Sequence, residues 1–393
     1  MVNDKSKSTC NNLGYLRVLF FHNTLPEYRI QWFMKLANKA NIKFVFTNEY
    51  LNRKNYGFNI DYDKVKNLDC TFISNGIKGF KQLYRIIIDI RFFDFVELPS
   101  IDTLREAIIS AIIIFKCKCC NVKVGYFWEK WEAPKDKQPL KRKIKNFLLR
   151  LVHFFVYKYV DVLFSVGLKN KAYFISCGVS ENKIYWIPNV SETPKCKYED
   201  IRAKFDIDKD KKLILYLGRV LPQKGVRNLI KSISMLDETA KNSCCLLVAG
   251  DGEDLNYCKS LATSLNLSNI RFSGKVVPSE RGNYFSQCDI FVYPVTYYKG
   301  RVDVWGLTLN EALQHCKFII ATEAVGSSFE LIENNVNGFR IRPDSLVELT
   351  ESIKKSINNN KGVLVKTKSL ELIHIYNYEN MADVYLSIVR SLL

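Results

Sequence analysis

"LILYLGRVLPQKGVRNLI" (residues 213–230) is the stretch from which the fold can best be predicted. Its first part is a continuous apolar run of strand length, typical of a strand buried on both faces of a sheet. Gly218 allows a turn after that run, and from Gly225 onward apolar residues recur at helical spacing. A buried strand that leads directly into a helix is the unit of a parallel sheet, so the stretch predicts an α/β fold.

The same unit recurs on both sides of this stretch. Amphipathic or apolar runs of helical length occur between strand-like runs, and for one such helix Asp102 or Thr103 is the predicted N-cap. This alternation indicates doubly wound sheets, in which ligands bind outside the carboxyl ends of the strands. Further strand-like runs lie at residues 16–21, 42–46, 93–99, 122–127, 160–166, 183–188, 245–250, 269–274, 290–294 and 317–322.

A polar stretch, "NVSETPKCKYEDIRAKFDIDKDKK" (residues 189–212), separates two series of strands. It has turn formers and charges but no apolar period, which is typical of a linker or hinge. We therefore predict two Rossmann-like, doubly wound domains facing a central cleft, residues 1–190 and 191–376. The helical run at residues 377–393 is predicted to cross back and pack on the first domain.

The composition limits the class of protein and of partner. The chain has 393 residues, a formal net charge of +18 and a pI of about 9.2. Such a charge favours an anionic partner: nucleic acid, an anionic membrane surface or a phosphorylated substrate. The first residues lack the apolar core of a signal peptide, and no apolar run is long enough to span a bilayer, so we expect a cytoplasmic protein. The 12 cysteines and 4 histidines show no metal-ligand spacing, which predicts inert thiols and no metal site.

Two loops after predicted strands have the chemistry of a phosphate site. Arg219 and Lys224 lie between a strand end and a helix start, where two cations and free N–H groups can hold a diphosphate. Gly250 and Gly252, in "LLVAGDGEDL" (residues 246–255), also follow a strand and would let a ligand approach the backbone closely. Each signal is weak alone, because solvated basic loops and Gly-x-Gly turns are common.

"DVWGLTLNEALQHCKFIIATEAVGSSFELI" (residues 303–332) places two carboxylates around the start of a predicted helix. The N–H groups of Gly306 and Leu307 at that helix start would face an anion. The carboxylates of Asp303 and Glu311 can accept hydrogen bonds from hydroxyl groups. Phosphate and hydroxyl recognition together indicate a nucleotide sugar. The alternative is a solvated loop that leads into a core helix.

The ordered set of motifs resembles a known family. "GR…KG…LI", "AGDG", "FSGKV", "DVWGLTLNEA" and "GSSFELIENNVNGF" are similar, in this order, to the donor-binding half of retaining GT-B glycosyltransferases (glycosyl transferases group 1, family 4). "VLFFHNTLPEYRIQWFMKLA" and "VDVLFSV…GVSENKIYWIPN" extend the resemblance, more loosely, over the N-terminal half. It implies that residues 1–190 form the acceptor domain and residues 191–376 the nucleotide-sugar donor domain.

The resemblance also implies a reaction and roles for the site residues. The reaction is transfer of a sugar, typically a hexose, with retention of configuration, from a nucleotide-diphosphate sugar to a hydroxyl of a glycan or lipid-linked acceptor, in cell-surface polysaccharide or glycolipid synthesis. Arg219 and Lys224 would bind the diphosphate and stabilise its charge as it leaves. Glu311 would bond the ribose, and Gly306 and Leu307 would donate N–H groups to phosphate. No cofactor and no metal are implied.

Two positions depart from the family pattern. Asp303 stands where the family usually has a glutamate near the donor sugar, and the shorter side chain puts its reach to the sugar in doubt. The family often has a glycine-rich loop after the first strand, but here that loop is "HNTLPEY" (residues 22–28).

Three further stretches admit two interpretations each. Glu129 and Glu132, in "YFWEKWEAP", follow a predicted strand and could orient the acceptor hydroxyl or act as a base, or they could belong to a surface loop. "DYD" (residues 61–63) imitates a metal-binding motif, but no strand-like run directly precedes it. The basic, aromatic-rich run at residues 135–159 predicts either a face for an anionic membrane or a half-buried helix with a solvated basic side; both can hold at once.

Two other functions remain as alternatives. One is a phosphorylase or epimerase with the same fold, although a pyridoxal-type phosphorylase would need a Schiff-base lysine and usually a much longer chain. The other is a basic nucleic-acid-binding protein, but the sequence contains no recognition module for DNA or RNA. We therefore predict a glycosyltransferase that is peripheral on the cytoplasmic face of a membrane and does not bind nucleic acid.

Overall fold

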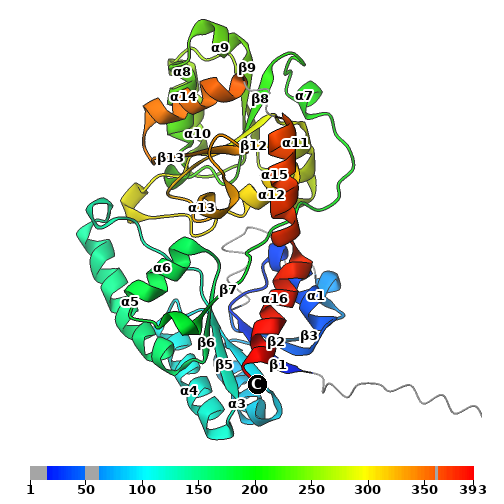
Figure 1. The fold of residues 1–393 in the computed structure, drawn as a ribbon, viewed down its shortest axis with the longest axis vertical. Coiled ribbons are helices and arrows are strands. Elements are labelled where there is room, and N and C mark those ends of the chain that lie inside the picture. Colours follow the sequence, from blue (N-terminus) through cyan, green and yellow to red (C-terminus); the bar gives the residue numbers. More distant parts are fainter. Residues whose placement is uncertain (1–15, 49–61, 359–361) are drawn as a thin grey trace, which may run out of the picture. The chain divides into compact units, whose positions relative to one another are not determined.

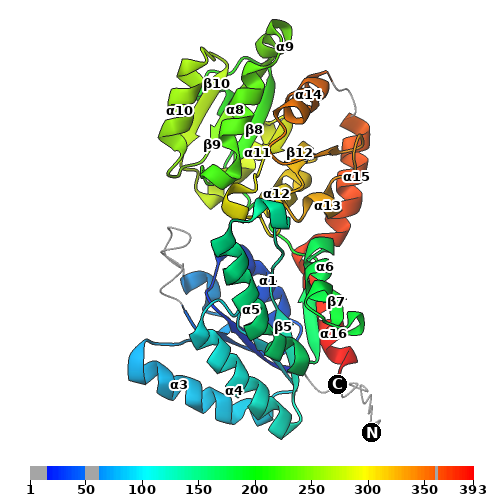
Figure 2. The ribbon, with the colours of Figure 1, turned by 90° about the vertical axis from the view of Figure 1, so that its left-hand side faces the viewer.

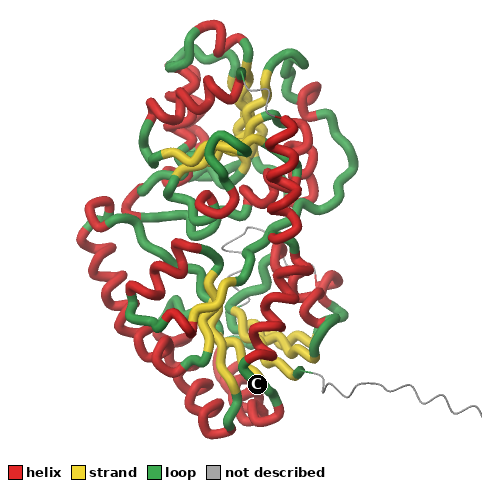
Figure 3. The backbone as a smooth tube through the Cα atoms, in the orientation of Figure 1, coloured by secondary structure: helices red, strands yellow, loops and turns green. Residues whose placement is uncertain are grey.

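The structure is a computed structural model that describes residues 16–48, 62–358 and 362–393. Its strands form two sheets, which Figure 3 shows in yellow with helices in red on their faces. The first sheet has seven strands in the order β3-β2-β1-β4-β5-β6-β7, and the second has six in the order β10-β9-β8-β11-β12-β13. The pairs β1–β2 and β8–β9 are parallel with unbroken register. The prediction of two doubly wound α/β sheets is confirmed.

The first sheet contains the strands nearest the N-terminus. Its strands are β1 (Arg17–His22), β2 (Asn41–Phe46), β3 (Asp69–Phe72), β4 (Phe95–Leu98), β5 (Lys123–Phe127), β6 (Val162–Ser165) and β7 (Ile184–Trp186). The helices along this half are α1 (Glu27–Ala37), α3 (Gly76–Ile88), α4 (Leu104–Cys120), α5 (Leu140–Tyr159) and α6 (Leu168–Ser176). Thr103 is the N-cap of α4, and its backbone N–H donates to Glu106 Oε2 at 2.7 Å.

The second sheet carries most of the predicted site residues. Its strands are β8 (Lys212–Leu217), β9 (Cys244–Ala249), β10 (Ile270–Gly274), β11 (Ile290–Tyr293), β12 (Phe318–Thr322) and β13 (Gly338–Ile341). Every residue of β9, β11 and β12 is buried, which explains their continuous apolar runs. The helices along this half are α7 (Ile201–Lys204), α8 (Val226–Ser234), α9 (Glu238–Asn242), α10 (Leu255–Ser264), α11 (Arg281–Gln287), α12 (Thr308–Gln314), α13 (Ser328–Leu331), α14 (Leu346–Ile357) and α15 (Gly362–Ile375). The last helix, α16 (Tyr378–Ser391), packs near β6 of the first sheet.

By their internal contacts, the described residues group into two compact units: those up to Gly125 together with Leu386–Leu393, and those from Tyr126 to Tyr385. The first break falls at the end of β5, earlier than the boundary near residue 190 that the sequence suggested. The ring of Tyr385 in α16 lies 4.8 Å from that of Phe164 in β6. The predicted functional division into residues 1–190 and 191–376, with a crossover helix at 377–393, stays a prediction.

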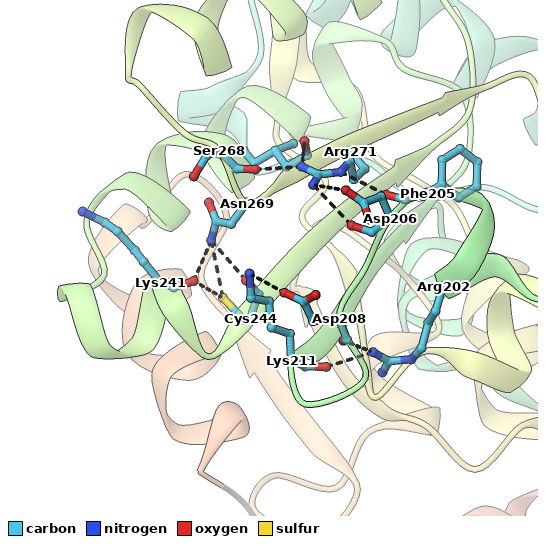
Figure 4. A network of polar contacts seen from close by, with 11 residues as sticks. Arg202, Phe205, Asp206, Asp208, Lys211, Lys241, Cys244, Ser268, Asn269 and Arg271 are labelled. Carbon is cyan, nitrogen blue, oxygen red and sulfur yellow. Dashed lines mark hydrogen bonds and ion pairs between the residues drawn. The ribbon is translucent and has the colours of Figure 1, made fainter.

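The polar stretch at residues 189–212 is not a free linker. Figure 4 shows how its second half is tied to the second sheet. Arg271 of β10 donates from Nε to the Phe205 carbonyl at 3.0 Å. Within the stretch itself, Arg202 donates to the carbonyls of Asp208 and Lys211 at 3.1 and 3.0 Å. The stretch has no apolar period because polar groups attach it to the second sheet. Hydrogen bonds of this kind leave no periodic pattern in the sequence.

Candidate functional site

The loop that carries both predicted cations lies at the carboxyl end of β8. Arg219 is exposed and follows Gly218 directly, while Lys224 is half-buried at the end of a short 3₁₀ turn. The next residue, Gly225, has φ +74°, and a Cβ there would lie 1.8 Å from the Pro294 carbonyl oxygen. Gly225 therefore lets the loop press against the end of β11, the strand beside β8, and this contact brings Lys224 to Tyr293.

Lys224, Tyr293 and Asp303 form a closed triangle of polar contacts. Lys224 Nζ donates to Tyr293 Oη at 2.6 Å and to Asp303 Oδ2 at 2.5 Å, and Tyr293 Oη donates to the same Asp303 oxygen at 2.6 Å. The side chains of Lys224 and Asp303 are only 13% and 18% exposed. The sequence predicted Lys224 and Asp303 as site residues. The structure adds Tyr293 and shows that Asp303 holds Lys224 in place.

The charges around Asp303 decide its protonation. Burial alone would raise the pKa of the Asp303 carboxyl, but the charge and hydrogen bond of Lys224, the hydrogen bond of Tyr293 and the charge of Arg219 outweigh burial and hold that pKa below its ordinary value. Burial first, and then the Asp303 charge, raise the pKa of Tyr293 well above its ordinary value. At neutral pH Asp303 is thus a carboxylate and Tyr293 a neutral phenol.

The backbone around Asp303 explains how a loop residue is held so firmly. Residues 303–305 run beside the segment after β12: the Asp303 N–H donates to the Ala324 carbonyl at 2.9 Å, and the Gly326 N–H donates to the Asp303 carbonyl at 3.0 Å. Gly306 then turns the chain into α12 with φ +86°, where a Cβ would lie 2.5 Å from Val325. The hypothesis of a merely solvated loop does not describe this segment.

Glu311 lies in α12, and its two carboxylate oxygens have different surroundings. Its side chain is buried, and Oε1 accepts hydrogen bonds from Ser191 Oγ at 2.8 Å and from Arg281 Nη1 at 2.9 Å. Oε2 is equally buried but has no hydrogen-bond partner within the described part of the chain. A buried carboxylate oxygen without a partner is costly, so Oε2 is a position at which Glu311 can accept a further hydrogen bond.

Gly250 and Gly252 serve close packing of the chain on itself. A Cβ on Gly250 would lie 1.8 Å from the Gly218 carbonyl oxygen, and one on Gly252 would lie 2.2 Å from the Val220 carbonyl oxygen. The loop after β9 therefore fits directly against the loop after β8. The sequence suggested that glycine here lets a ligand approach the backbone. In the structure, the backbone of the neighbouring loop is what comes close to both glycines.

The loop after β5 contains the two glutamates that were predicted for the acceptor. Glu132 forms an ion pair with Arg150 of α5, with Oε2 3.1 Å from Nη2, so its carboxylate is already engaged. Glu129 is half-buried. Between them, Trp131 is buried and donates from Nε1 to the Val304 carbonyl at 3.1 Å, which ties this loop to the neighbour of Asp303.

Within the described residues, no group of three or more His, Cys, Asp or Glu side chains could hold a metal ion. Of the "DYD" motif, Asp61 lies outside the described residues, and Asp63 is exposed. Among the described helices none is both long and apolar enough to cross a membrane.

Sequence reasoning missed Tyr293, Arg281 and Ser191. Tyr293 ends a strand that neighbours β8 in the sheet, so the strand order of a doubly wound domain was the signal that could have found it. Ser191 lies 120 positions before Glu311 in the sequence, and Arg281 lies 30 positions before it. No local pattern joins such distant partners.

Comparison with known proteins identifies the family. Residues 197–369 match the family described as glycosyl transferases group 1, and these residues include Arg219, Lys224, Asp303 and Glu311. Over these residues the chain belongs to the group 1 glycosyltransferases. Its fold is GT-B: HepE from Anabaena, solved in complex with UDP, superposes with a TM-score of 0.74 at 14% identity, covering 96% of this chain and 100% of that one. The predicted family and fold are confirmed.

Relatives in sequence agree with this assignment. An uncharacterized glycosyltransferase of Methanocaldococcus jannaschii, MJ1069, is 29% identical over 292 residues, which cover 72% of this chain and 69% of the relative. An N,N'-diacetylbacillosaminyl-diphospho-undecaprenol alpha-1,3-N-acetylgalactosaminyltransferase of Campylobacter jejuni is 27% identical over 233 residues, which cover 57% of this chain and 58% of that enzyme. The matched residues thus span 69% and 58% of the lengths of these two relatives.

Proposed function

We propose that this glycosyltransferase moves a sugar, with retention of configuration, from a nucleoside-diphosphate sugar to a hydroxyl of a glycan or lipid-linked acceptor. The free, buried Oε2 of Glu311 is the observation that carries the proposal, because it leaves one acceptor position open for the ribose hydroxyls of a nucleotide. Relatives support the donor and acceptor classes. HepE has been solved with UDP-glucose, and the name of the Campylobacter enzyme includes a diphospho-undecaprenol group.

Lys224 and Arg219 are proposed to bind the diphosphate and stabilise it as it leaves. The Lys224 ammonium has three N–H donors, and two of them already bond Tyr293 and Asp303. The third donor remains for a phosphate oxygen, while the exposed Arg219 guanidinium adds a second charge. Since Lys224 is fixed before the donor arrives, its charge needs little reorganisation when negative charge develops on the leaving group.

The donor's two ends are proposed to meet the two acids. Glu311 bonds the ribose through Oε2, and Asp303 lies near the transferred sugar. The backbone N–H groups of Gly306 and Leu307, which precede α12, are the proposed additional phosphate contacts. For the acceptor, Glu129 and Glu132 stay candidates, although the ion pair of Glu132 with Arg150 favours a structural role for that side chain.

Helix α5 supports a proposal about location at a membrane. Asn146, His153, Val156 and Tyr157 form its buried side. Its outward side exposes large apolar residues, namely Leu140, Ile144, Phe147, Leu148, Leu151, Val152, Phe154, Phe155 and Tyr159, interspersed with lysines. The helix is half-buried, as one of the two interpretations of the sequence requires. For its exposed side we propose that α5 attaches the protein to the anionic cytoplasmic face of a membrane, where a lipid-linked acceptor would be met.

A screen of nucleotide sugars by thermal stabilisation tests the proposed function. A donor present at about 100 times its dissociation constant adds about 2.7 kcal/mol of stability. We expect one class of nucleoside-diphosphate sugar to raise the melting temperature, and Glu311→Gln to weaken that shift. If a complete panel leaves the melting temperature unchanged while inorganic phosphate or DNA raises it, the donor proposal is wrong.

A further inference from the structure

Helix α3 turns an apolar side toward solvent. Ile77 and Phe80 are 78% and 72% exposed, and Tyr84 and Ile88 continue the same stripe at helical spacing. The opposite side of α3 is the packed one, where Leu83 and other residues are buried. A surface helix normally has the reverse pattern, with its apolar stripe facing the core.

Helix α4 repeats this arrangement. Leu104 and Phe115 are 73% and 72% exposed, and Ile108 and Ile112 complete a stripe along one side. The buried side consists of Glu106, Ser110, Ile113, Ile114 and Cys117. The helices α3 and α4 pack against the same short 3₁₀ turn (Asp89–Phe92) and lie side by side in both ribbon views (Figures 1 and 2). We call the eight residues of the two stripes the α3–α4 face: Ile77, Phe80, Tyr84, Ile88, Leu104, Ile108, Ile112 and Phe115.

The charges on α3 and α4 beside the α3–α4 face are cationic, and the exposed Asp89 lies just past the end of α3. Lys78, Lys81 and Arg85 line one flank of the stripe on α3, and that helix contains no acidic residue. The single acidic residue of α4, Glu106, is buried; its Oε1 accepts from Asn48 Nδ2 and its Oε2 from the Thr103 N–H. Lys116 lies beside the stripe on α4. An apolar stripe flanked by lysine and arginine, without accessible carboxylates on its helices, is the pattern of a helix that lies in a bilayer interface.

This charge pattern favours an anionic lipid bilayer over a second copy of the chain as the partner of the α3–α4 face. In a two-fold contact between copies of the chain, each α3–α4 face would meet the same face of its partner, so that two cationic flanks would come together. Anionic lipid headgroups instead complement the cations while the acyl region takes up the apolar side chains. We propose that the α3–α4 face is a docking surface for an anionic lipid bilayer, in addition to the one proposed on α5. The inference deepens the proposed function, because a bilayer surface is where a lipid-linked acceptor would be met.

Co-sedimentation of the full chain with vesicles tests this inference. The vesicles contain phosphatidylcholine either alone or with about 30% phosphatidylglycerol, which gives them the negative surface potential of a cytoplasmic leaflet. The test variant Phe80→Glu/Phe115→Glu changes two exposed residues of the face. The matched control, Val347→Glu/Val363→Glu, makes the same change of charge at residues that are 66% and 81% exposed on α14 and α15.

We expect the test variant to bind anionic vesicles about tenfold more weakly or worse, and the control to lose much less, because only the test pair meets the acyl region. Equal affinities of the two variants would overturn the inference. So would a test variant that keeps vesicle binding but loses self-association in sedimentation velocity, which would assign the face to a second copy of the chain.

Two further measurements keep the test decisive. If the test variant does not fold, as judged by circular dichroism, Lys78→Gln/Lys81→Gln replaces it. We expect this variant to bind anionic vesicles more weakly than the wild type and neutral vesicles equally well. Binding to anionic vesicles equal to that of the wild type contradicts the inference.

Thermal stabilisation by nucleotide sugars is measured on every variant. Failure of the donor proposal would abolish that shift in the wild-type protein, whereas failure of the docking surface would leave the shift intact and vesicle binding unaltered by the substitutions.

Discussion

At the scale of single residues, Lys224 is the best-defined member of the site. Its ammonium donates to Tyr293, at the end of β11, and to Asp303, in the loop before α12, and it keeps one N–H donor for a ligand. Removing a preorganised charge opposite a leaving group typically costs about 100- to 1000-fold in rate. We expect Lys224→Ala and Arg219→Ala to lower kcat by such factors without unfolding the protein. Lys231→Ala, an exposed lysine on α8, is the control for loss of a charge. Near-wild-type turnover in both site variants would show that the diphosphate lies elsewhere.

At the scale of elements, the start of helix α6 depends on an acid from another helix. Glu330 of α13 accepts a hydrogen bond from the Leu168 N–H at 2.5 Å through Oε1, and a Cβ on Gly167 would lie 2.6 Å from that oxygen. Burial raises the pKa of the Glu330 carboxyl from 4.5 to about 7, although this hydrogen bond and the charges of Arg340 and Lys169 act in the opposite direction. The acid is therefore partly protonated near neutral pH, which a carboxyl group in solution is not.

This raised pKa gives a pH prediction with a definite sign. The folded protein holds the Glu330 proton more tightly than the unfolded chain, so the stabilisation is complete below pH 4.5 and is lost as the pH rises through about 7. Glu330→Gln cannot ionise. Its free energy of unfolding, minus that of the wild type, should rise by about 1–3 kcal/mol between acidic and alkaline conditions. Urea denaturation at several pH values measures the difference, and a difference that does not change with pH would refute the assignment.

Helix α5 supports a separate prediction about attachment to membranes. Phe147→Glu/Phe154→Glu places two carboxylates on its exposed apolar side and should weaken binding to anionic vesicles. The wild-type attraction should also weaken with salt, because charges are screened within about 8 Å at physiological ionic strength. Co-sedimentation at low and high salt measures both effects. Equal binding to neutral and anionic vesicles would leave α5 as a half-buried helix only.

The elements also show what a sequence can predict. Continuous apolar runs identified β1, β2, β9 and β12 because strands buried on both faces need no alternation. The sequence did not predict β3, because none of its four residues is fully buried and it therefore has no continuous apolar run. In the site, Arg219, Lys224, Asp303 and Glu311 were recognised from local motifs. The partners that fix them, Tyr293, Arg281 and Ser191, depend on strand order and long-range packing, which no single stretch encodes.

At the scale of the whole molecule, the second sheet supplies the proposed donor chemistry through cations and acids. Because Arg219 and Lys224 can neutralise a leaving diphosphate, we predict that activity survives EDTA. The measurement is release of the nucleoside diphosphate from a verified donor, before and after chelation. Complete loss of activity that Mn²⁺ or Mg²⁺ restores would contradict the prediction and return attention to the "DYD" motif at residues 61–63.

The central claim is that Asp303 and Glu311 bind opposite ends of one nucleotide-sugar donor. Calorimetric titration of the nucleoside diphosphate, without its sugar, into Asp303→Asn and Glu311→Gln tests this claim most directly. A hydrogen bond to a charged acceptor is worth about 1.5–3 kcal/mol, so we expect Glu311→Gln to weaken the nucleotide more than tenfold. Asp303→Asn should weaken the nucleotide less than Glu311→Gln does, because an amide oxygen can still accept a hydrogen bond from Lys224, and it should lower turnover. Equal weakening by both substitutions, or no effect of either, would contradict the account.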